Sequence, residues 1–346
     1  MTGSTKFGSM KRRLMILGIV SVFGVAVAEV GARVVSQHFR QRVMTYDPIV
    51  GWRPIPGAQL LEDAGNGSYQ VSINSAGLRD IEYPVQAVSS HSRMLILGDS
   101  LCFGYGGVSH PEIFSEILET HLQNVDVINL GVPGFSTDQQ HLYLQQVGLQ
   151  YQPSVVLLCL YQDDFSASFE SFIPTMSRPK GRVRLVGKTL EFLPPQFSWY
   201  FLLVENSMLA GAVESQIGLV PYLQPRPRSE ATMTQDNMDK TYRLMLKAIL
   251  QQCQSRQVTL AMMIQPGYLL TPEQDHTRRI ANEFASDRNV PLLDLNDCAP
   301  FQEPDAVSKY CFDDRIHLNR SGHQHVETNL REFVSELELF PTELQE

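Results

Sequence analysis

The sequence predicts an α/β protein with a parallel β-sheet and helices on both faces. Three observations lead to this prediction. Short apolar runs, typical of buried strands, alternate with longer segments that carry apolar residues at helical spacing. Turn residues follow the first of these runs, at Gly98-Asp99-Ser100. With 346 residues, 43% of them hydrophobic, the chain is long enough for one large domain with additions.

Residues 1–42 are predicted to form a cytoplasmic tip and a membrane anchor or signal. A basic cluster at 11–13 precedes the charge-free run Leu14–Ala28, which is the order of a basic region and an apolar region in exported proteins. Cleavage after Ala28 would release a secreted protein. Apolar residues continue to Val35, interrupted only by Glu29 and Arg33, and this length favours an uncleaved single-pass anchor. The body would then lie outside the cytoplasm, in a periplasm or at the cell surface.

The charge is divided between the two ends of the chain. Residues 1–42 carry a net charge of +6, and the remaining residues carry −15. An acidic body disfavours nucleic acid as a partner, because nucleic-acid binding needs a positive surface. The division favours a soluble domain that is held near the membrane.

Residues 43–88 are predicted to form a small β-rich region before the main domain. The run Tyr69–Ile73 alternates polar and apolar residues, and glycines, prolines and aromatic residues surround it. The region ends in the turn 74–80, whose Arg79 is expected to be solvated, as arginines near turns usually are. Its expected role is to pack against the domain that follows.

Residues 89–346 are predicted to form the main domain, with an insert at 166–235 that interrupts the α/β alternation. The insert is expected to contain a hairpin over Arg182–Leu193 and an apolar helix over Phe197–Ile217. It packs on the core, acts as a lid, or lies on the membrane through its aromatic residues Phe197, Trp199, Tyr200 and Phe201. Strands are expected at Met94–Leu97, Val125–Leu130, Val155–Leu160, Val258–Ile264 and Val290–Leu295, and helices at Pro111–Glu119, Asp236–Arg256, Pro272–Asp287 and Arg320–Leu339.

Two short motifs at opposite ends of this domain carry candidate chemistry. Ser100 follows a predicted strand at the sheet edge where ligands of open α/β sheets bind. Taken alone, Asp99 or Ser100 in this turn would simply cap the next helix. Near the other end, Asp314 and His317 have the spacing that lets a carboxylate orient an imidazole toward a serine.

Together the two motifs resemble the SGNH, or GDSL-type, hydrolase family, over roughly residues 95–330. The resemblance implies a three-layer, flavodoxin-like αβα fold. It implies Ser100, Asp314 and His317 as a catalytic triad. It also implies an oxyanion hole formed by Ser100 and Gly134, the second of which matches the last glycine of the family's second block.

The third block departs from the family's pattern. Asp163 stands where the family has an asparagine that donates its amide to the oxyanion, and an ionised carboxylate would oppose this charge. Three alternatives remain open: burial beside Asp164 keeps Asp163 protonated, Gln162 donates in its place, or the oxyanion hole is weak.

The expected activity is cleavage of an ester by a serine esterase, with no cofactor and no metal. The substrate would be an ester or an acylated carbohydrate or lipid. A cell-envelope polysaccharide O-acyltransferase and a non-catalytic envelope protein remain alternatives. A hard cation held by Asp163, Asp164, Asp313 and Asp314 is disfavoured, because no dense loop of oxygen ligands accompanies them. Cys298 and Cys311 are candidates for a disulfide.

Overall fold

The computed structural model describes residues 4–36, 42–63, 68–87, 91–173, 176, 178–217 and 233–340. The chain forms two compact units. One consists of Met1–Gln41 and Phe197–Gln224, and the other of Arg42–Gln196 and Pro225–Glu346. The predicted boundaries at 42/43 and 88/89 remain predictions, since residues 37–41 and 88–90 lie outside the described part of the chain.

The larger unit is built on a five-stranded sheet in which every pair is parallel. Its spatial order is β13-β12-β7-β5-β6. Numbered along the chain, this is the order 2-1-3-4-5 of flavodoxin-like folds, which confirms the predicted fold class. The strands are β5 (Ser92–Gly98), β6 (Val125–Gly131), β7 (Val155–Leu160), β12 (Thr259–Ile264) and β13 (Leu292–Asp294).

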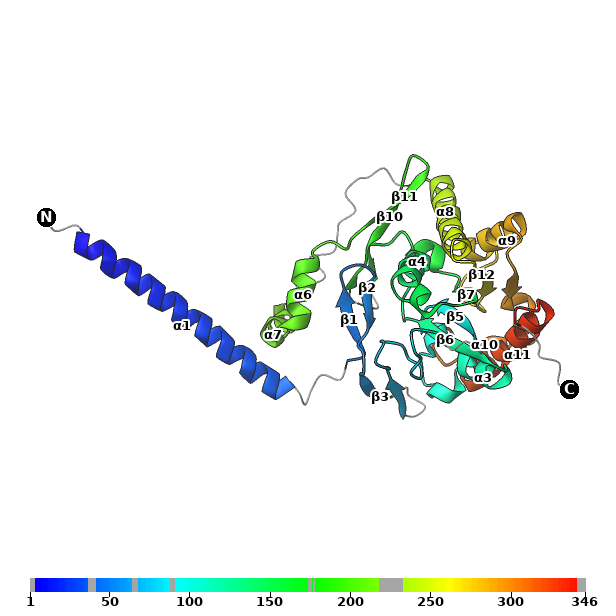
Figure 1. Cartoon of the computed structure of the whole chain (residues 1–346), viewed down its shortest axis with the longest axis horizontal. Helices are drawn as coiled ribbons and strands as arrows, with labels where there is room; N and C mark the ends of the chain where they lie inside the picture. Colours follow the sequence, from blue (N-terminus) through cyan, green and yellow to red (C-terminus); the bar gives the residue numbers. More distant parts are fainter. Residues whose placement is uncertain are drawn as a thin grey trace. The chain divides into compact units, whose positions relative to one another are not determined.

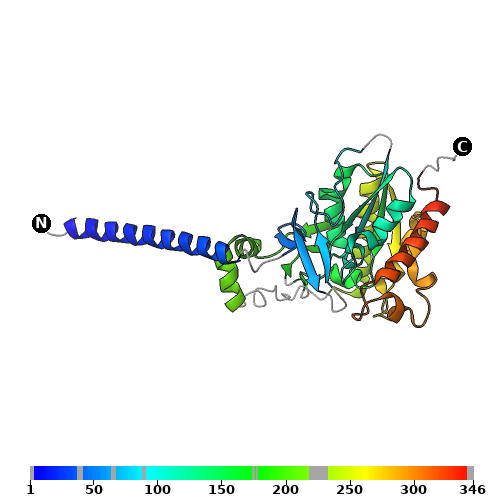
Figure 2. The ribbon, with the colours of Figure 1, turned by 90° about the horizontal axis from the view of Figure 1, so that it is seen from below.

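Helices cover both faces of this sheet (Figures 1 and 2). Successive strand residues point to opposite faces, so Leu95 and Leu97 join one apolar cluster while Met94 and Ile96 join the other. The first cluster includes residues of α4 (Thr137–Gln146), α8 (Gln235–Gln254) and α9 (His276–Arg288); the second includes residues of α3 (Phe114–His121), α10 (Ala306–Tyr310) and α11 (Arg320–Glu336).

Two predicted helix starts are wrong. The helix expected from Pro111 is divided into the short 3₁₀ helix η1 (His110–Glu112) and α3, because Ile113 between them has an extended backbone. The helix expected from Pro272 begins at His276 instead. There the Asp275 side chain accepts a hydrogen bond from the N–H of Arg278 and caps the helix.

The region after residue 42 contains two hairpins, and the alternating run Tyr69–Ile73 lies mostly in the last of their strands. Strand β1 (Met44–Asp47) pairs with β2 (Gly51–Pro54), and β3 (Gln59–Asp63) pairs with β4 (Ser68–Ser72). Trp52 of β2 is fully buried and belongs to the same apolar cluster as Leu95 and Leu97. The hairpins therefore pack on the core of the larger unit.

The predicted insert is divided between the two units. The short pair β8 (Phe172–Ile173) and β9 (Arg178–Pro179) and the expected hairpin, β10 (Arg182–Val186) with β11 (Thr189–Leu193), belong to the larger unit. The single helix expected over 197–217 is two helices, α6 (Ser198–Asn206) and α7 (Met208–Ile217), because Ser207 has an extended backbone.

The smaller unit joins α6 and α7 to a long N-terminal helix, α1 (Ser4–Ser36). Glu29 of α1 accepts hydrogen bonds from the hydroxyl of Ser207 and the N–H groups of Met208 and Leu209, and so caps α7. The segment Leu14–Arg33 is long and apolar enough to cross a membrane, a property that membrane anchors and signal sequences share.

The disulfide considered for Cys298 and Cys311 is not formed. All five cysteines are free, including Cys298 and Cys311. The thiol of Cys298 donates instead to the carbonyl oxygen of Asp294. Cys298 and Cys311 flank one loop in the sequence, but a disulfide also requires the two sulfur atoms to meet in a specific geometry, which sequence separation does not determine.

Candidate active site

Ser100 lies at the carboxyl end of β5, next to the point where the strand order of the sheet reverses. It begins the one-turn helix α2 (Ser100–Phe103), which Asp99 caps by accepting a hydrogen bond from the N–H of Leu101. Strand β7, the neighbour of β5, carries Asp163 beyond its own carboxyl end. The reversal point of an open α/β sheet is where ligands bind, and Ser100 and Asp163 both line a cavity there.

The structure brings Ser100, His317 and Asp314 together. The hydroxyl oxygen of Ser100 lies 2.8 Å from Nε2 of His317. Nδ1 of the same ring lies 2.6 Å from Oδ2 of Asp314. The three groups therefore form one continuous hydrogen-bonded chain from the serine hydroxyl to the carboxylate.

The loop that carries Asp314 and His317 holds itself in shape. Oδ1 of Asp314 accepts the N–H groups of Ile316 and His317, while its Oδ2 faces the imidazole. Partial burial works to raise the pKa of Asp314, but these hydrogen bonds outweigh it and lower that pKa below its ordinary value. Asp314 therefore stays ionised at neutral pH.

Gly134 stands in a turn that other parts of the larger unit hold close. Its φ of +76° suits glycine, and an added Cβ would lie 2.9 Å from Cγ of Met176. Nε1 of Trp52, from the first hairpin, donates to the carbonyl oxygen of Pro133 at 2.8 Å. The turn is thus supported by the region before the main domain as well as by the insert.

A buried ion pair supports the start of α4, just after this turn. Nζ of Lys180, from the insert, lies 2.7 Å from Oδ1 of Asp138 and 2.6 Å from the hydroxyl oxygen of Ser136. The lysine side chain is fully buried and that of Asp138 is 3% exposed. The sequence does not predict this pair, because a lysine in an insert is normally a surface residue.

Asp163 is open to the cavity, yet the surrounding protein removes water from it and raises its pKa. The Lys180 ammonium acts in the opposite direction. Burial, together with the charge of Asp163, raises the pKa of Asp99 to about 7. The side chain of Gln162 is turned elsewhere: it donates to the hydroxyl of Tyr161 and accepts from backbone N–H groups at 269 and 270.

The cavity has a volume of about 620 Å³ and mostly apolar walls. Both the first hairpins and the insert contribute to it. Its apolar lining includes Met44, Phe103, Phe135, Ile173, Met176 and Leu269. Carboxyl groups also line it, at Glu62, Asp99 and Asp163, and Arg178 is the one lysine or arginine among its described lining residues.

Arg79 does not have the solvated position expected from the sequence. It is buried and donates to the carbonyl oxygens of Phe103, Gly104 and Val108. These carbonyls belong to the end of α2 and the loop after it, so Arg79 supports the segment that carries Ser100. It makes no contribution to the cavity lining.

Asn129 is a second supporting residue that the sequence analysis missed. Its amide donates to the carbonyl oxygen of Cys102 in α2 and to the hydroxyl of Ser115, and its Oδ1 accepts the N–H of Gly131. An asparagine between the apolar residues Ile128 and Leu130 of a strand was the available signal, since a buried amide needs several partners.

The aspartates considered for a hard cation are not gathered into one group. Among the described residues, the one cluster of three or more metal-ligating side chains consists of Asp80, His110 and Glu116. It was not anticipated, since Asp80 lies 30 residues before His110 in the sequence.

Comparison with known proteins identifies the family. The model of the GDSL-like lipase/acylhydrolase family matches residues 94–328, about two thirds of the chain. The chain therefore belongs to this family and is a hydrolase that acts on ester bonds. No curated protein matches the chain.

Several solved structures are similar to the chain. They include the psychrotrophic esterase EstA from a Pseudoalteromonas species (16% identity, 71% of this chain and 98% of that chain, TM-score 0.41) and the lipase/acylhydrolase from Enterococcus faecalis (15% identity, 71% and 96%, TM-score 0.41). The acetyl xylan esterase AlAXEase is 15% identical, over 70% of this chain and 99% of that chain, with a TM-score of 0.40.

Proposed function

We propose that the protein is a serine esterase whose triad consists of Ser100, His317 and Asp314. The observation that carries the proposal is the unbroken hydrogen-bonded chain from Asp314 through His317 to Ser100, which ends at a cavity. Asp314 accepts the Nδ1–H of His317, and this leaves Nε2 free to take the serine proton.

The reaction proceeds through an acyl-enzyme. The hydroxyl oxygen of Ser100 attacks the ester carbonyl while His317 accepts its proton, and His317 then protonates the departing alcohol. Water, activated by the same imidazole, releases the acid and restores Ser100. The groups that react all belong to the chain, so the proposal needs no cofactor.

The oxyanion is stabilised by the backbone N–H groups of Ser100 and Gly134. The carboxyl of Asp163, which lines the cavity and whose pKa burial raises, becomes a third donor when it is protonated. Gln162 is not the third donor, since its amide is directed at Tyr161. Of the alternatives left open by the sequence, donation by Gln162 therefore has the least support.

The membrane is a proposed partner of the smaller unit. The helix Leu14–Arg33 crosses the bilayer with its basic end in the cytoplasm, and the hydrolase unit lies outside the cytoplasm. The exposed apolar side chains of α6 and α7 that include Trp199, Leu203 and Val213 favour an interfacial position for these two helices.

The test is hydrolysis of a short-chain nitrophenyl ester by the full chain in detergent, beside Ser100→Ala. We expect turnover in the parent and its loss in the variant, with unchanged circular dichroism. Turnover that persists in the variant would contradict the proposal. Adding a sugar as acceptor tests for acyl transfer. Formation of an acylated sugar would make this protein an O-acyltransferase that uses the same triad.

A further inference from the structure

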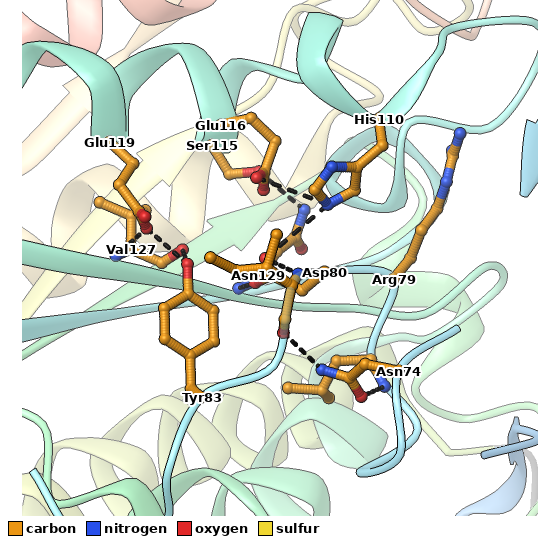
Figure 3. A network of polar contacts seen from close by, with 12 residues as sticks. Asn74, Arg79, Asp80, Tyr83, His110, Ser115, Glu116, Glu119, Val127 and Asn129 are labelled. Atoms are coloured by element: carbon orange, nitrogen blue, oxygen red, sulfur yellow. Dashed lines mark hydrogen bonds and ion pairs between the residues drawn. The ribbon is translucent and has the colours of Figure 1, made fainter. Parts of the chain in front are cut away.

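A second cluster of titratable groups lies where the segment after β4 approaches α3. Figure 3 shows Asp80, His110 and Glu116 directed toward one another. His110 begins η1 and Glu116 lies in the first turn of α3. One ligand atom from each residue lies within 4.8 Å of the other two. The proposed ester cleavage uses none of the three.

Two distances in this cluster are close to those between ligands of one ion. Nε2 of His110 lies 3.4 Å from Oε2 of Glu116 and 3.7 Å from Oδ1 of Asp80. Two atoms bound to a tetrahedral Zn²⁺ at about 2.0–2.2 Å lie roughly 3.3–3.6 Å apart. Moreover, Nε2 of His110 is buried and makes no hydrogen bond. A buried ring nitrogen that makes no hydrogen bond needs an explanation, and a bound cation supplies one.

The charge around the cluster also favours a cation. The Asp80 side chain is fully buried and that of Glu116 is 11% exposed. A third carboxylate, Glu119, accepts the hydroxyl of Tyr83 and the N–H of Val127 nearby. The Arg79 guanidinium donates to backbone carbonyls and not to Asp80 (Figure 3). Burial lowers the pKa of His110, and the positive charge of Arg79 acts in the same direction. The negative charge of two carboxylates equals the positive charge of one divalent ion, and the imidazole is neutral. A bound ion therefore lowers the free energy cost of burying the carboxylates.

The carboxylates are oriented by further contacts, as metal ligands usually are. Oδ2 of Asp80 accepts the N–H of Asn129 at 2.8 Å, and its Oδ1 accepts the N–H of Ile81. The hydroxyl of Ser115 lies 3.2 Å from Oε1 of Glu116, which leaves Oε2 directed at His110. Asn129 also contacts α2, so the cluster is joined to the segment that carries Ser100.

We propose that Asp80, His110 and Glu116 bind one Zn²⁺ through Oδ1, Nε2 and Oε2. An imidazole and only three protein ligands suit zinc better than Ca²⁺ or Mg²⁺, which take more oxygen ligands. Water completes the tetrahedron, and the exposed part of His110, 24% of its side chain, provides the way in. The ion fastens residues 74–80 to η1 and α3 and is structural.

The test is calorimetric titration of Zn²⁺ into the untagged full chain in detergent, after treatment with a chelator and dialysis. We expect one site per chain and a rise in Tm when the site is filled. His110→Ala is expected to weaken Zn²⁺ binding at least about 100-fold. His91→Ala is the matched control, because His91 pairs with Asp126 outside the cluster. Should His110→Ala fail to fold, Glu116→Gln replaces it, with the same expected loss.

X-ray absorption of the zinc-loaded protein gives an independent result. We expect oxygen and nitrogen neighbours at about 2.0–2.2 Å and no sulfur neighbour. A sulfur neighbour would overturn the proposal, since it would place the ion on a cysteine. Equal binding by the parent and His110→Ala would overturn it as well. So would the absence of Zn²⁺ binding, or tight Ca²⁺ binding in its place; protons, or a hard cation, would then occupy the cluster.

Discussion

Two histidines lie among carboxylates in the larger unit, and their surroundings differ in kind. His317 has partners at hydrogen-bond distance on both ring nitrogens, Asp314 at 2.6 Å and Ser100 at 2.8 Å. His110 has carboxylates at 3.4 Å and 3.7 Å and no hydrogen bond at Nε2. The contacts of His317 define a path for a proton. The longer distances around His110 are those of the proposed zinc ligands.

The carboxylates beside the two histidines also differ in their electrostatics. Hydrogen bonds lower the pKa of Asp314 in spite of partial burial. Burial raises the pKa of Glu116 to about 8 and that of Asp80 well above its ordinary value. The same residue types therefore differ in charge state. An ionised carboxylate orients His317, whereas the carboxylates near His110 need a positive charge or a proton beside them.

Replacing His317 tests the proton path, and the largest effect is expected there. His317→Ala should lower kcat for ester hydrolysis about 10⁵–10⁶-fold, because Ser100 then lacks its base. His91→Ala, at an exposed ion pair, serves as the control. Steady-state kinetics with a nitrophenyl ester measures both. A loss in His317→Ala below about tenfold would break the comparison, since His317 would then be no more than a neighbour of Ser100.

Replacing Asp314 tests whether its charge orients the ring. Asp314→Asn is expected to lower kcat about 10³–10⁴-fold, since the amide favours the wrong imidazole tautomer. Asp313→Asn, at the adjacent exposed carboxylate, should retain activity within about twofold. Equal kcat values for the two variants would remove Asp314 from the mechanism.

Asp138 is a further buried carboxylate, and the ammonium of Lys180 neutralises its charge. Lys180→Met should lower the free energy of unfolding by about 3–5 kcal/mol, because Asp138 is left buried and unpaired. Lys240→Met breaks an exposed pair with Asp236 and should cost about 0.5 kcal/mol or less. Urea denaturation compares the two. Similar midpoints would show that Asp138 takes up a proton at little cost.

Asp163 should give the smallest effect, seen in the pH profile. If its protonated form donates to the oxyanion, the parent loses activity as pH rises through the raised pKa of Asp163, because ionisation removes the donor. Asp163→Asn keeps a donor at every pH, so we expect it to exceed the parent about tenfold at high pH and to equal it at low pH. A large loss in Asp163→Asn at all pH values, with the fold intact, would count against this role.

The sequence predicted most helices and strands of the main domain, but it predicted the residues at which they begin and end less accurately. Strand β7 occupies the predicted residues, because six consecutive apolar residues are typical of a buried strand. The divided helices at Ile113 and Ser207 were missed, because single extended residues do not interrupt an apolar pattern. The division at Ser207 depends on Glu29, some 180 residues away in the sequence, and no local signal reports it.

The sequence by itself determined the α/β class, the family and the residues proposed to react. Each of these depends on local pattern: periodicity, a turn after a strand, and a carboxylate three residues from a histidine. Tertiary structure alone decided the burial of Arg79, the Lys180–Asp138 pair and the cluster at His110. The physical reason is that burial and pairing of charges depend on which distant segments meet, and chain folding brings together residues that no spacing in the sequence relates.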